Sequence, residues 1–178
     1  MIKKLAILGI VIAGLLSAAC FGAPKEPVMP EPTPPVATVS EHECVVYRMP
    51  ADGSEWLVPE KVSVKGDKKD LPKLALEALI KTQPKSDKLK NIFPPGVELL
   101  SLWVEDGTAV ADFSRELKNI PDGSYTELML TTAMVDTLTE FPQIKRLRIY
   151  VVGKKVATLK GHVDLVDPLE RNTDIIKK

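Results

Sequence analysis

DGSYTELMLTTAMVDTLTEFPQIKRLRIYVVGKKV, residues 122–156, is the stretch of sequence that decides the fold. It predicts one long helix followed directly by one strand. Ser124 and Glu127 have the S-x-x-E spacing of a capping box, in which each side chain satisfies a backbone N–H group that is free at a helix start. Pro142 is expected to end the helix. Residues 146–151 then alternate polar and apolar side chains, which predicts a strand with one buried face.

The predicted helix has a broad apolar arc when its residues are placed at about 100° each on a helical wheel. The members of this arc are Leu128, Leu130, Ala133, Met134, Val135 and Leu138. Tyr125, Met129, Asp136 and Glu140 fall on the opposite side. A helix this apolar is expected to lie on a sheet, against the strand face of Leu147, Ile149 and Val151. The other strand face is then free to meet water or a partner.

The N-terminus is typical of a secretory signal, because residues 1–20 contain two lysines, an apolar run and three small residues before Cys20. The apolar run is shorter than the roughly 20 residues that cross a bilayer. A cysteine directly after small residues resembles a lipoprotein signal, in which Cys20 is acylated and becomes the first residue of the mature chain. Ser17 stands where such signals usually place Leu, so an ordinary cleaved signal beside an incidental cysteine is the alternative.

A proline-rich segment follows, and residues 21–40 are expected to form an extended tether. Residues 41–171 suit a single domain with one core, and residues 172–178 are expected to be a polar C-terminal tail. The chain has 24 basic and 24 acidic residues, a balance that gives no indication of nucleic-acid binding. If Cys20 is acylated, Cys44 has no partner for an internal disulfide and is expected to be a small buried hydrophobic residue.

The folded part begins with an expected hairpin of residues 44–49 and 56–65. Pro59 lacks an N–H for a sheet ladder, so the second of these strands is expected at a sheet edge. Asp70 is placed to cap a helix that reaches about Thr82, because apolar residues recur there with helical spacing.

The segment 99–113 predicts a tight hairpin, because Asp106-Gly107 favours a two-residue turn. Counting outward from the turn pairs Val104 with Ala109, Leu102 with Ala111 and Leu100 with Phe113, all on a face that packs inward. The opposite face carries Trp103 beside Val110 and Ser101 beside Asp112.

After the long helix and its strand, Gly153-Lys154 predicts a second tight turn and residues 155–159 a return strand. The complete order is ββαββαββ. This order predicts the α+β class, a two-layer sandwich with a mixed or antiparallel sheet and two helices on one face.

Five blocks of sequence resemble the GerMN domain family. They are LALEALI (74–80), VEDGTAVADFS (104–114), ELMLTTAMVDTLTEFP (127–142), IKRLRIYVVGK (144–154) and GHVDLVDPLER (161–171). The resemblance implies a non-enzymatic envelope domain that is similar to ring-building modules, which assemble side by side in secretion-like channels. The founding member of the family is a spore-germination and sporulation lipoprotein with two such domains, whereas this chain has one. Fold membership alone does not establish function.

Candidate chemistry is sparse. His42 with Cys44 and His162 with Asp164 are potential metal ligands, but zinc sites usually show paired Cys or His at short fixed spacing, so no metal or cofactor is expected. Asp112 lacks a second carboxylate beside it for acid–base catalysis, and no serine stands in a G-x-S-x-G motif. We therefore expect a protein that is not an enzyme.

The open face of the sheet is the more informative candidate site. Trp103, Val110, Arg146, Arg148 and Tyr150 are expected to point away from the helices, and aromatic residues and arginine are enriched at binding hot spots. These residues are the predicted partner-binding set, although ordinary solvated strand positions also carry Arg and Tyr.

Together, the N-terminal signal and the family resemblance imply a lipid-anchored assembly module on the outer face of the cytoplasmic membrane or in the cell envelope. Its expected partners are the membrane, envelope proteins or a second copy of itself, and its expected role lies in sporulation, spore germination or cell-wall remodelling. The alternative is an envelope enzyme or ligand-binding protein that acts on peptidoglycan or a small molecule. A deep pocket with converging polar groups would favour that alternative.

Overall fold

The structure is a computed structural model that describes residues 40–177. The expected signal peptide, the lipid-attachment residue Cys20 and the expected tether up to residue 39 lie outside the described residues. Within the described part, no helix is both long enough and apolar enough to span a membrane.

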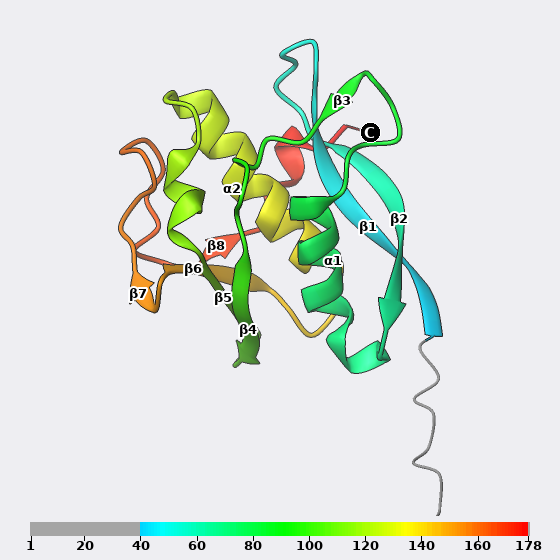
Figure 1. The fold of residues 1–178 in the computed structure, drawn as a ribbon. Helices are drawn as coiled ribbons and strands as arrows, with labels where there is room; N and C mark the ends of the chain where they lie inside the picture. The colour runs from blue at the N-terminus through cyan, green and yellow to red at the C-terminus, as the bar shows by residue number, and fades with distance from the viewer. Residues whose placement is uncertain (1–39, 178) are drawn as a thin grey trace, which may run out of the picture. The chain divides into compact units, whose positions relative to one another are not determined.

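One sheet contains three antiparallel strands, β1 (Ser40–Pro50), β2 (Val58–Gly66) and β3 (Leu89–Lys90), in the order β2-β1-β3. β1 and β2 form the opening hairpin that the sequence predicts, and Figure 1 shows them as a long ribbon. Pro59 lies opposite Tyr47 on β2, which is an edge strand, so the expected edge position is confirmed.

A second, mixed sheet contains β4 (Leu99–Glu105), β5 (Thr108–Phe113), β6 (Arg146–Val151), β7 (Lys154–Lys155) and β8 (Leu169–Glu170). β4 and β5 are antiparallel, whereas β5 and β6 are parallel because a helix carries the chain back between them. β7 and β8 both pair with β6, at its two ends. β4 is therefore one edge of this sheet, and β7 and β8 share the other.

Two α-helices accompany these sheets, α1 (Leu71–Lys81) and α2 (Ser124–Leu138), with short 3₁₀ helices η1 (Lys68–Asp70), η2 (Arg115–Asn119) and η3 (Thr173–Ile175). The α+β class with two helices and mixed pairing is confirmed. The strands divide between two sheets, however, and α2 contacts both β1 of one sheet and β6 of the other.

The position of α2 between β1 and β6 corrects the expected helical wheel. Met129 and Asp136, on the side opposite the apolar arc, are fully buried, while Leu128 of the arc is exposed. A helix that is covered around most of its circumference needs no single apolar stripe. The helix begins at Ser124 as predicted but ends at Leu138, before Pro142.

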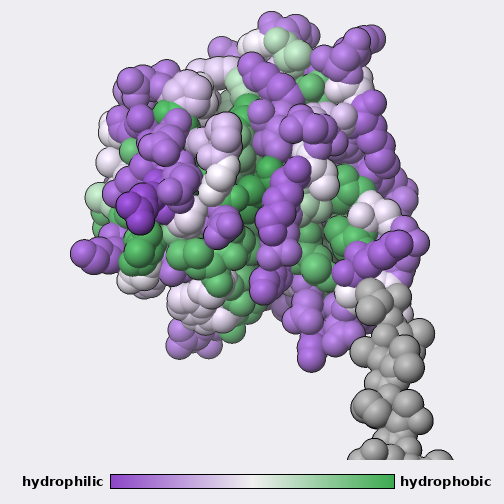
Figure 2. Space-filling view, viewed as in Figure 1, coloured by the Kyte–Doolittle hydropathy of each residue, from purple (hydrophilic) through white to green (hydrophobic). Residues whose placement is uncertain are grey.

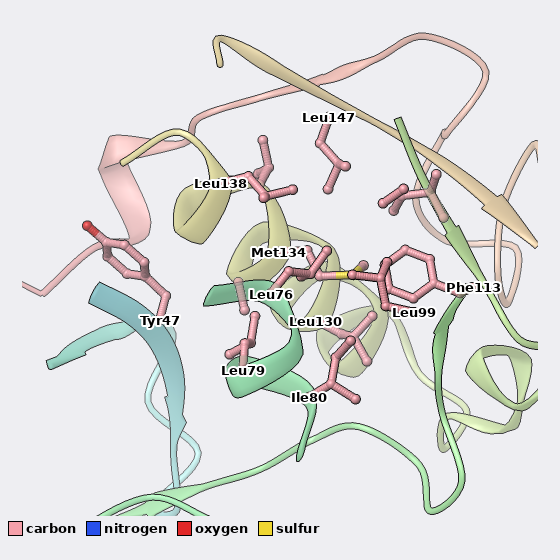
Figure 3. Packing of buried hydrophobic residues seen from close by; sticks show 14 of the residues in the cluster. Tyr47, Leu76, Leu79, Ile80, Leu99, Phe113, Leu130, Met134, Leu138 and Leu147 are labelled. Carbon is pink, nitrogen blue, oxygen red and sulfur yellow. The ribbon is translucent and has the colours of Figure 1, made fainter. Parts of the chain in front are cut away.

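The core contains most of the predicted residues. Leu130, Met134 and Leu138 of α2 pack with the inward face of β6, and Figure 3 shows Leu130 and Met134 close to Phe113 of β5. Cys44 is also buried in this core, as expected for a small hydrophobic residue.

The pairing of the β4–β5 hairpin is confirmed at Val104 and Leu102 but not at Leu100, and Val104, expected to pack inward, is exposed. A β-bulge between Leu99 and Ser101 places Leu99, not Leu100, opposite Phe113. Leu99 is consequently 8% exposed and belongs to the core, whereas Leu100 is 48% exposed. The extra residue of the bulge thus reverses the expected burial of two neighbouring leucines.

The C-terminal region also differs from the prediction. The second tight turn consists of Val152 and Gly153, since Val151 pairs with Lys154, and β7 has only two residues. Residues 172–177, expected as a polar tail, pack against the domain. Leu57 is fully buried there, donating its N–H to the carbonyl oxygen of Ile175 and accepting from the N–H of Lys177.

Candidate functional site

The strand register places the predicted partner-binding residues on one face of the five-stranded sheet. Val110 pairs with Trp103 on one side and with Arg148 on the other. Tyr150 and Arg146 lie in the neighbouring rows, two residues from Arg148 along β6. We call Trp103, Val110, Arg146, Arg148 and Tyr150 the outer face, because the residues between them on β6, Leu147 and Ile149, belong to the core.

An aromatic pair lies at the centre of the outer face. The rings of Trp103 and Tyr150 meet edge to face, with centroids 6.2 Å apart and planes at 84°. Trp103 is nevertheless 43% exposed. Such an arrangement fixes a large aromatic side chain on the surface without covering it, which is a property of interface anchors.

Val110 does not belong to the accessible part of the outer face. It is 6% exposed although it points away from the core, because it stands in register between the larger side chains of Trp103 and Arg148. The prediction that Val110 contacts a partner is therefore corrected. Its position supports the two larger side chains that remain accessible.

Charges of both signs lie on the outer face or directly beside it. Arg148 donates to the carbonyl oxygen of Val166 at 3.2 Å, and Arg146 is paired in register with Glu170. Asp112 is paired in register with Tyr150 and supplies a negative charge. Its role is structural, because both of its carboxylate oxygens accept the N–H of Gly153 at 3.0 Å. A face with both signs of charge suits a protein partner better than a polyanion.

Figure 2, which has the view of Figure 1, shows apolar side chains reaching the surface between hydrophilic ones in the region of β4. Three exposed large hydrophobic residues of the described part lie on this strand: Leu100, Trp103 and Val104. The edge beside the outer face is therefore also apolar.

Glu127 has a different role from the predicted capping box. The residue before Ser124 is Gly123, whose φ of 131° favours glycine, and no side chain caps the helix. The buried carboxylate of Glu127 instead accepts four hydrogen bonds from residues 158–162. The donors are the Thr158 hydroxyl at 2.7 Å and the backbone N–H groups of Leu159, Lys160 and His162 at 2.8, 3.1 and 2.9 Å.

These contacts determine the protonation of Glu127. Burial alone raises the pKa of its carboxyl, but the hydrogen bonds from Thr158, Lys160, His162 and Leu159 together outweigh burial and lower the pKa. The carboxylate thus fixes the loop before β8 to the start of α2. No local sequence signal indicates this contact, because its partners are more than 30 residues away.

A second polar cluster joins β1, the end of α2 and the segment after β8. The Tyr47 hydroxyl donates to Glu140 at 2.7 Å, and Arg171 contacts both Glu140, at 2.6 Å, and Tyr47. Burial and then Glu140 raise the pKa of Tyr47 to about 12. Asp136 is fully buried beside this cluster, and burial raises its pKa to about 6 against the opposing effects of Arg171 and the Asn172 N–H.

A buried ion pair lies at the end of α1. Arg48 of β1 contacts Glu60 at 3.0 Å and donates to the carbonyl oxygen of Leu79 at 2.8 Å and the Thr82 hydroxyl at 2.6 Å. Burial lowers the pKa of Arg48, while Glu60 opposes this shift. Both side chains are buried, and their polar groups are used in these contacts. The pair therefore connects β1 and β2 to α1.

The four potential metal ligands do not form a metal centre. His162 contributes its backbone N–H to the Glu127 contact, and His42 lies on β1 opposite Val64. Within residues 40–177, no group of three or more His, Cys, Asp or Glu residues is arranged to hold a metal ion.

The surface also contains open hollows. One of about 350 Å³ lies between the segment after β3 and the segment before α2, and its lining comprises Met49, Lys90, Asn91, Ile92, Phe93, Pro94, Pro95, Asn119, Pro121 and Thr126. Lys90 is the one charged side chain in this lining. Asn91 is occupied structurally, since its amide donates to Ile80 and accepts from Phe93. This composition does not supply a pair of groups for acid–base chemistry.

Comparison with known proteins gives a consistent family signal. Residues 45–157 match the family model Germane, described as "Sporulation and spore germination". The spore germination protein GerM of Bacillus subtilis is 31% identical over 108 residues, which are 58% of this chain and 29% of GerM. The chain therefore spans less than a third of that relative.

Solved structures share the fold. The first GerMN domain of GerM from Bacillus subtilis has a TM-score of 0.61 at 20% identity, over 75% of this chain and 98% of that domain. The tandem GerMN domains of the same protein give 0.63 at 21% identity, over 74% of this chain and 46% of theirs. A putative lipoprotein from Clostridium perfringens gives 0.53 at 23% identity, over 73% of this chain and 87% of its own.

Proposed function

The chain belongs to the Germane family of sporulation and spore germination proteins, and on that premise we propose that it is a non-catalytic, membrane-tethered assembly module of the cell envelope. Its GerMN domain would act by binding neighbouring proteins in sporulation or spore germination. The names of its relatives refer to these processes and to no enzymatic reaction.

One observation carries the proposal of an interaction module. The accessible outer face combines the exposed Trp103 ring, held edge to face by Tyr150, with the guanidinium groups of Arg146 and Arg148. These residue types dominate the energetics of protein interfaces. They stand on strands of a packed sheet, so their positions are fixed before a partner arrives, which lowers the entropy cost of binding.

The proposed membrane tether rests on the N-terminal sequence. The apolar run, the small residues and Cys20 resemble a lipoprotein signal, and the proline-rich segment that follows provides a spacer. We propose that acylation of Cys20 holds the domain at the outer surface of the cytoplasmic membrane. Mass spectrometry of the membrane-extracted protein tests this point directly, since acylated Cys20 would be its N-terminal residue.

The outer face is tested by replacing Trp103→Ala together with Arg148→Glu in the full chain. The wild-type protein is crosslinked in its own membrane and the captured proteins are identified. The double variant is expected to lose specific captured neighbours while its thermal unfolding remains cooperative. Retention of all captured neighbours by a folded variant would show that the outer face is not the binding site.

A matched control is available on β2 and the segment before it. Trp56 and Lys65 are exposed as well, so Trp56→Ala with Lys65→Glu makes the same Trp truncation and the same reversal of one positive charge away from the outer face. This control is expected to retain the captured neighbours. Equal losses in both double variants would indicate a general effect of surface change and would contradict the assignment.

A further inference from the structure

The turn between β6 and β7 holds an apolar residue in a conformation that such residues rarely adopt. Val152 has a φ of 51° and Gly153 a φ of 71°, between the paired residues Val151 and Lys154. Two-residue turns with positive φ favour Asn and Gly, and a β-branched residue there is strained. Val152 is also 56% exposed, the highest value among the exposed large hydrophobic residues of the described part. Strain of this kind often marks a functional position.

Two contacts fix this turn to the sheet. The Val152 N–H donates to the Phe113 carbonyl oxygen at 2.9 Å, and the Gly153 N–H donates to Asp112. Lys154 and Lys155 follow the turn, both are exposed, and neither forms an ion pair with any residue in the range 40–177. The Val152 turn, defined as residues 152–155, therefore presents an apolar tip beside two unpaired positive charges.

The β4 edge, on the opposite side of the same sheet, presents an apolar side chain and a negative charge next to the row of residues that reaches the Val152 turn. The register forms one row of Leu99, Phe113, Val151 and Lys154 across the four strands. Leu100, beside Leu99, is the second most exposed of the large hydrophobic residues described. Glu98, directly before Leu99, is exposed and has no ion-pair partner among the described residues. The start of β4 thus presents an apolar side chain beside an unpaired negative charge.

We propose that the domain associates head to tail with a second copy of this chain, the Val152 turn of one copy contacting Glu98 and Leu100 at the β4 edge of the next. Within one copy β5 and β6 separate these two edges, so the contact requires two molecules. The two most exposed apolar side chains would cover each other, and the lysines would meet Glu98. This partner assignment rests on the proposed assembly function, because it names one component of the assembly.

Charge also selects the arrangement of the copies. Two β4 edges in a symmetric contact would bring the acidic residues Glu98, Glu105 and Asp106 of one copy against the acidic residues of the other, and two Val152 turns would bring lysines together. A head-to-tail contact instead pairs opposite charges. It leaves one β4 edge and one Val152 turn free at the two ends of the pair. Further copies are then able to join in series, into a ring or an open row according to the angle between neighbours.

Crosslinking with introduced cysteines tests the arrangement. The full chain is produced in its own membrane with Ser101→Cys, with Lys155→Cys, or with both, which leaves Leu100, Val152, Glu98 and Lys154 in place, and it is treated with a short bis-maleimide. The double variant is expected to give a ladder of dimers and larger species. A mixture of the two single variants is expected to give only a crosslinked dimer, and each single variant alone none beyond the wild-type background. Dimers from a single variant alone would show a symmetric contact, and no ladder from the double variant would refute the proposal.

A charge exchange distinguishes specific pairing from crowding in the membrane. Glu98→Lys or Lys154→Glu, each added to the double-cysteine chain, is expected to abolish the ladder, whereas a mixture of both chains is expected to restore it. A ladder that is insensitive to both changes would refute the contact. If these tests fail while the Trp103 and Arg148 variant still loses captured neighbours, the proposed assembly function stands with a different partner.

Val152→Asn distinguishes a role of Val152 in association from a role in the stability of the turn alone. Asn adopts positive φ more readily than Val, so this variant is expected to unfold at a higher temperature than the wild type. Its particle size in mild detergent is expected to fall to that of the monomer. A more stable variant with unchanged particle size would show that the exposed Val152 has no role in association.

Discussion

The carboxylate of Glu127, buried at the start of α2, accepts a hydrogen bond of 2.9 Å from the backbone N–H of His162. Three further donors from residues 158–160 complete the contact. Residues 157–168 lie between β7 and β8 and form no strand, so this carboxylate connects the segment to the domain in place of strand pairing. Because all four donors are buried or half-buried in this contact and have no other acceptor among residues 40–177, the arrangement is expected to dominate the stability of this region.

Glu127→Gln is expected to destabilise the fold by about 3 kcal/mol, because an amide offers the N–H donors one oxygen in place of two and brings an NH₂ group toward them. Urea unfolding at pH 7 measures this loss. Glu55→Gln is the matched control, since Glu55 is exposed, and it is expected to change stability by less than about 0.5 kcal/mol. Similar stabilities of both variants would contradict the role of Glu127.

The pH dependence of this difference has a defined sign. The pKa of Glu127 is lower in the folded state than the value of about 4.3 for an unperturbed Glu, so its stabilising effect is present above that value and is lost as the pH falls through the folded-state pKa. The stability gap between the wild type and Glu127→Gln is therefore expected to shrink below about pH 4. A gap that does not depend on pH would show that Glu127 contributes packing rather than charge.

The sequence predicts features whose causes are local. Asp106-Gly107 determines a two-residue turn through its own backbone preferences, and the alternation on β6 determines which residues share the outer face. Those signals place Trp103, Arg148 and Tyr150 together correctly. They do not predict the burial of Val110, which depends on the sizes of its neighbours on two other strands.

Features with distant causes are missed. The bulge at Leu100 interrupts a pairing that simple counting continues. The second side of α2 is covered by β1, where Tyr47 contacts Thr137, 90 residues later in the chain. Glu127 shows the same limit, because S-x-x-E describes a local contact and the actual partners lie beyond β7. Carboxylates at helix starts are thus ambiguous until their tertiary contacts are known.

Asp136→Asn is expected to stabilise the protein at neutral pH. Burial raises the pKa of Asp136 to about 6, so the folded state binds this proton more tightly than the unfolded state, whose pKa is about 3.9. The associated stability is present below about pH 4 and is lost as the pH rises through about 6, at most about 3 kcal/mol in total. In the wild type, Asp136 accepts a hydrogen bond from the Asn172 N–H at 3.3 Å, and the side-chain oxygen of Asn at position 136 is able to keep this bond.

Denaturant unfolding between pH 4 and pH 8 checks this prediction. The wild type is expected to lose stability relative to Asp136→Asn across that range, whereas Asp167→Asn, at an exposed position, is expected to follow the wild type. A variant that is less stable than the wild type at pH 8 would show that the ionised Asp136 is fully compensated by Arg171.

The buried pair of Arg48 and Glu60 is expected to be coupled strongly. Arg48→Met leaves Glu60 as an uncompensated buried charge and is expected to cost about 3–5 kcal/mol. Adding Glu60→Leu removes that charge, so the double variant is expected to be more stable than Arg48→Met alone. A double-mutant cycle by urea unfolding measures the coupling, and additive losses would contradict it.

The two neighbouring leucines of the bulge offer a direct test of the β4 register. Leu99 packs in the core opposite Phe113, so Leu99→Ala is expected to cost about 2–5 kcal/mol, because the substitution removes buried methyl groups and leaves a cavity. Leu100→Ala removes the same atoms from a half-exposed side chain and is expected to cost less than about 1 kcal/mol. Without the bulge Leu100 would face Phe113, and the two costs would be exchanged. Urea unfolding of the two variants therefore decides between the registers, and a larger loss for Leu100→Ala would contradict both the bulge and the placement of Leu100 at the free edge.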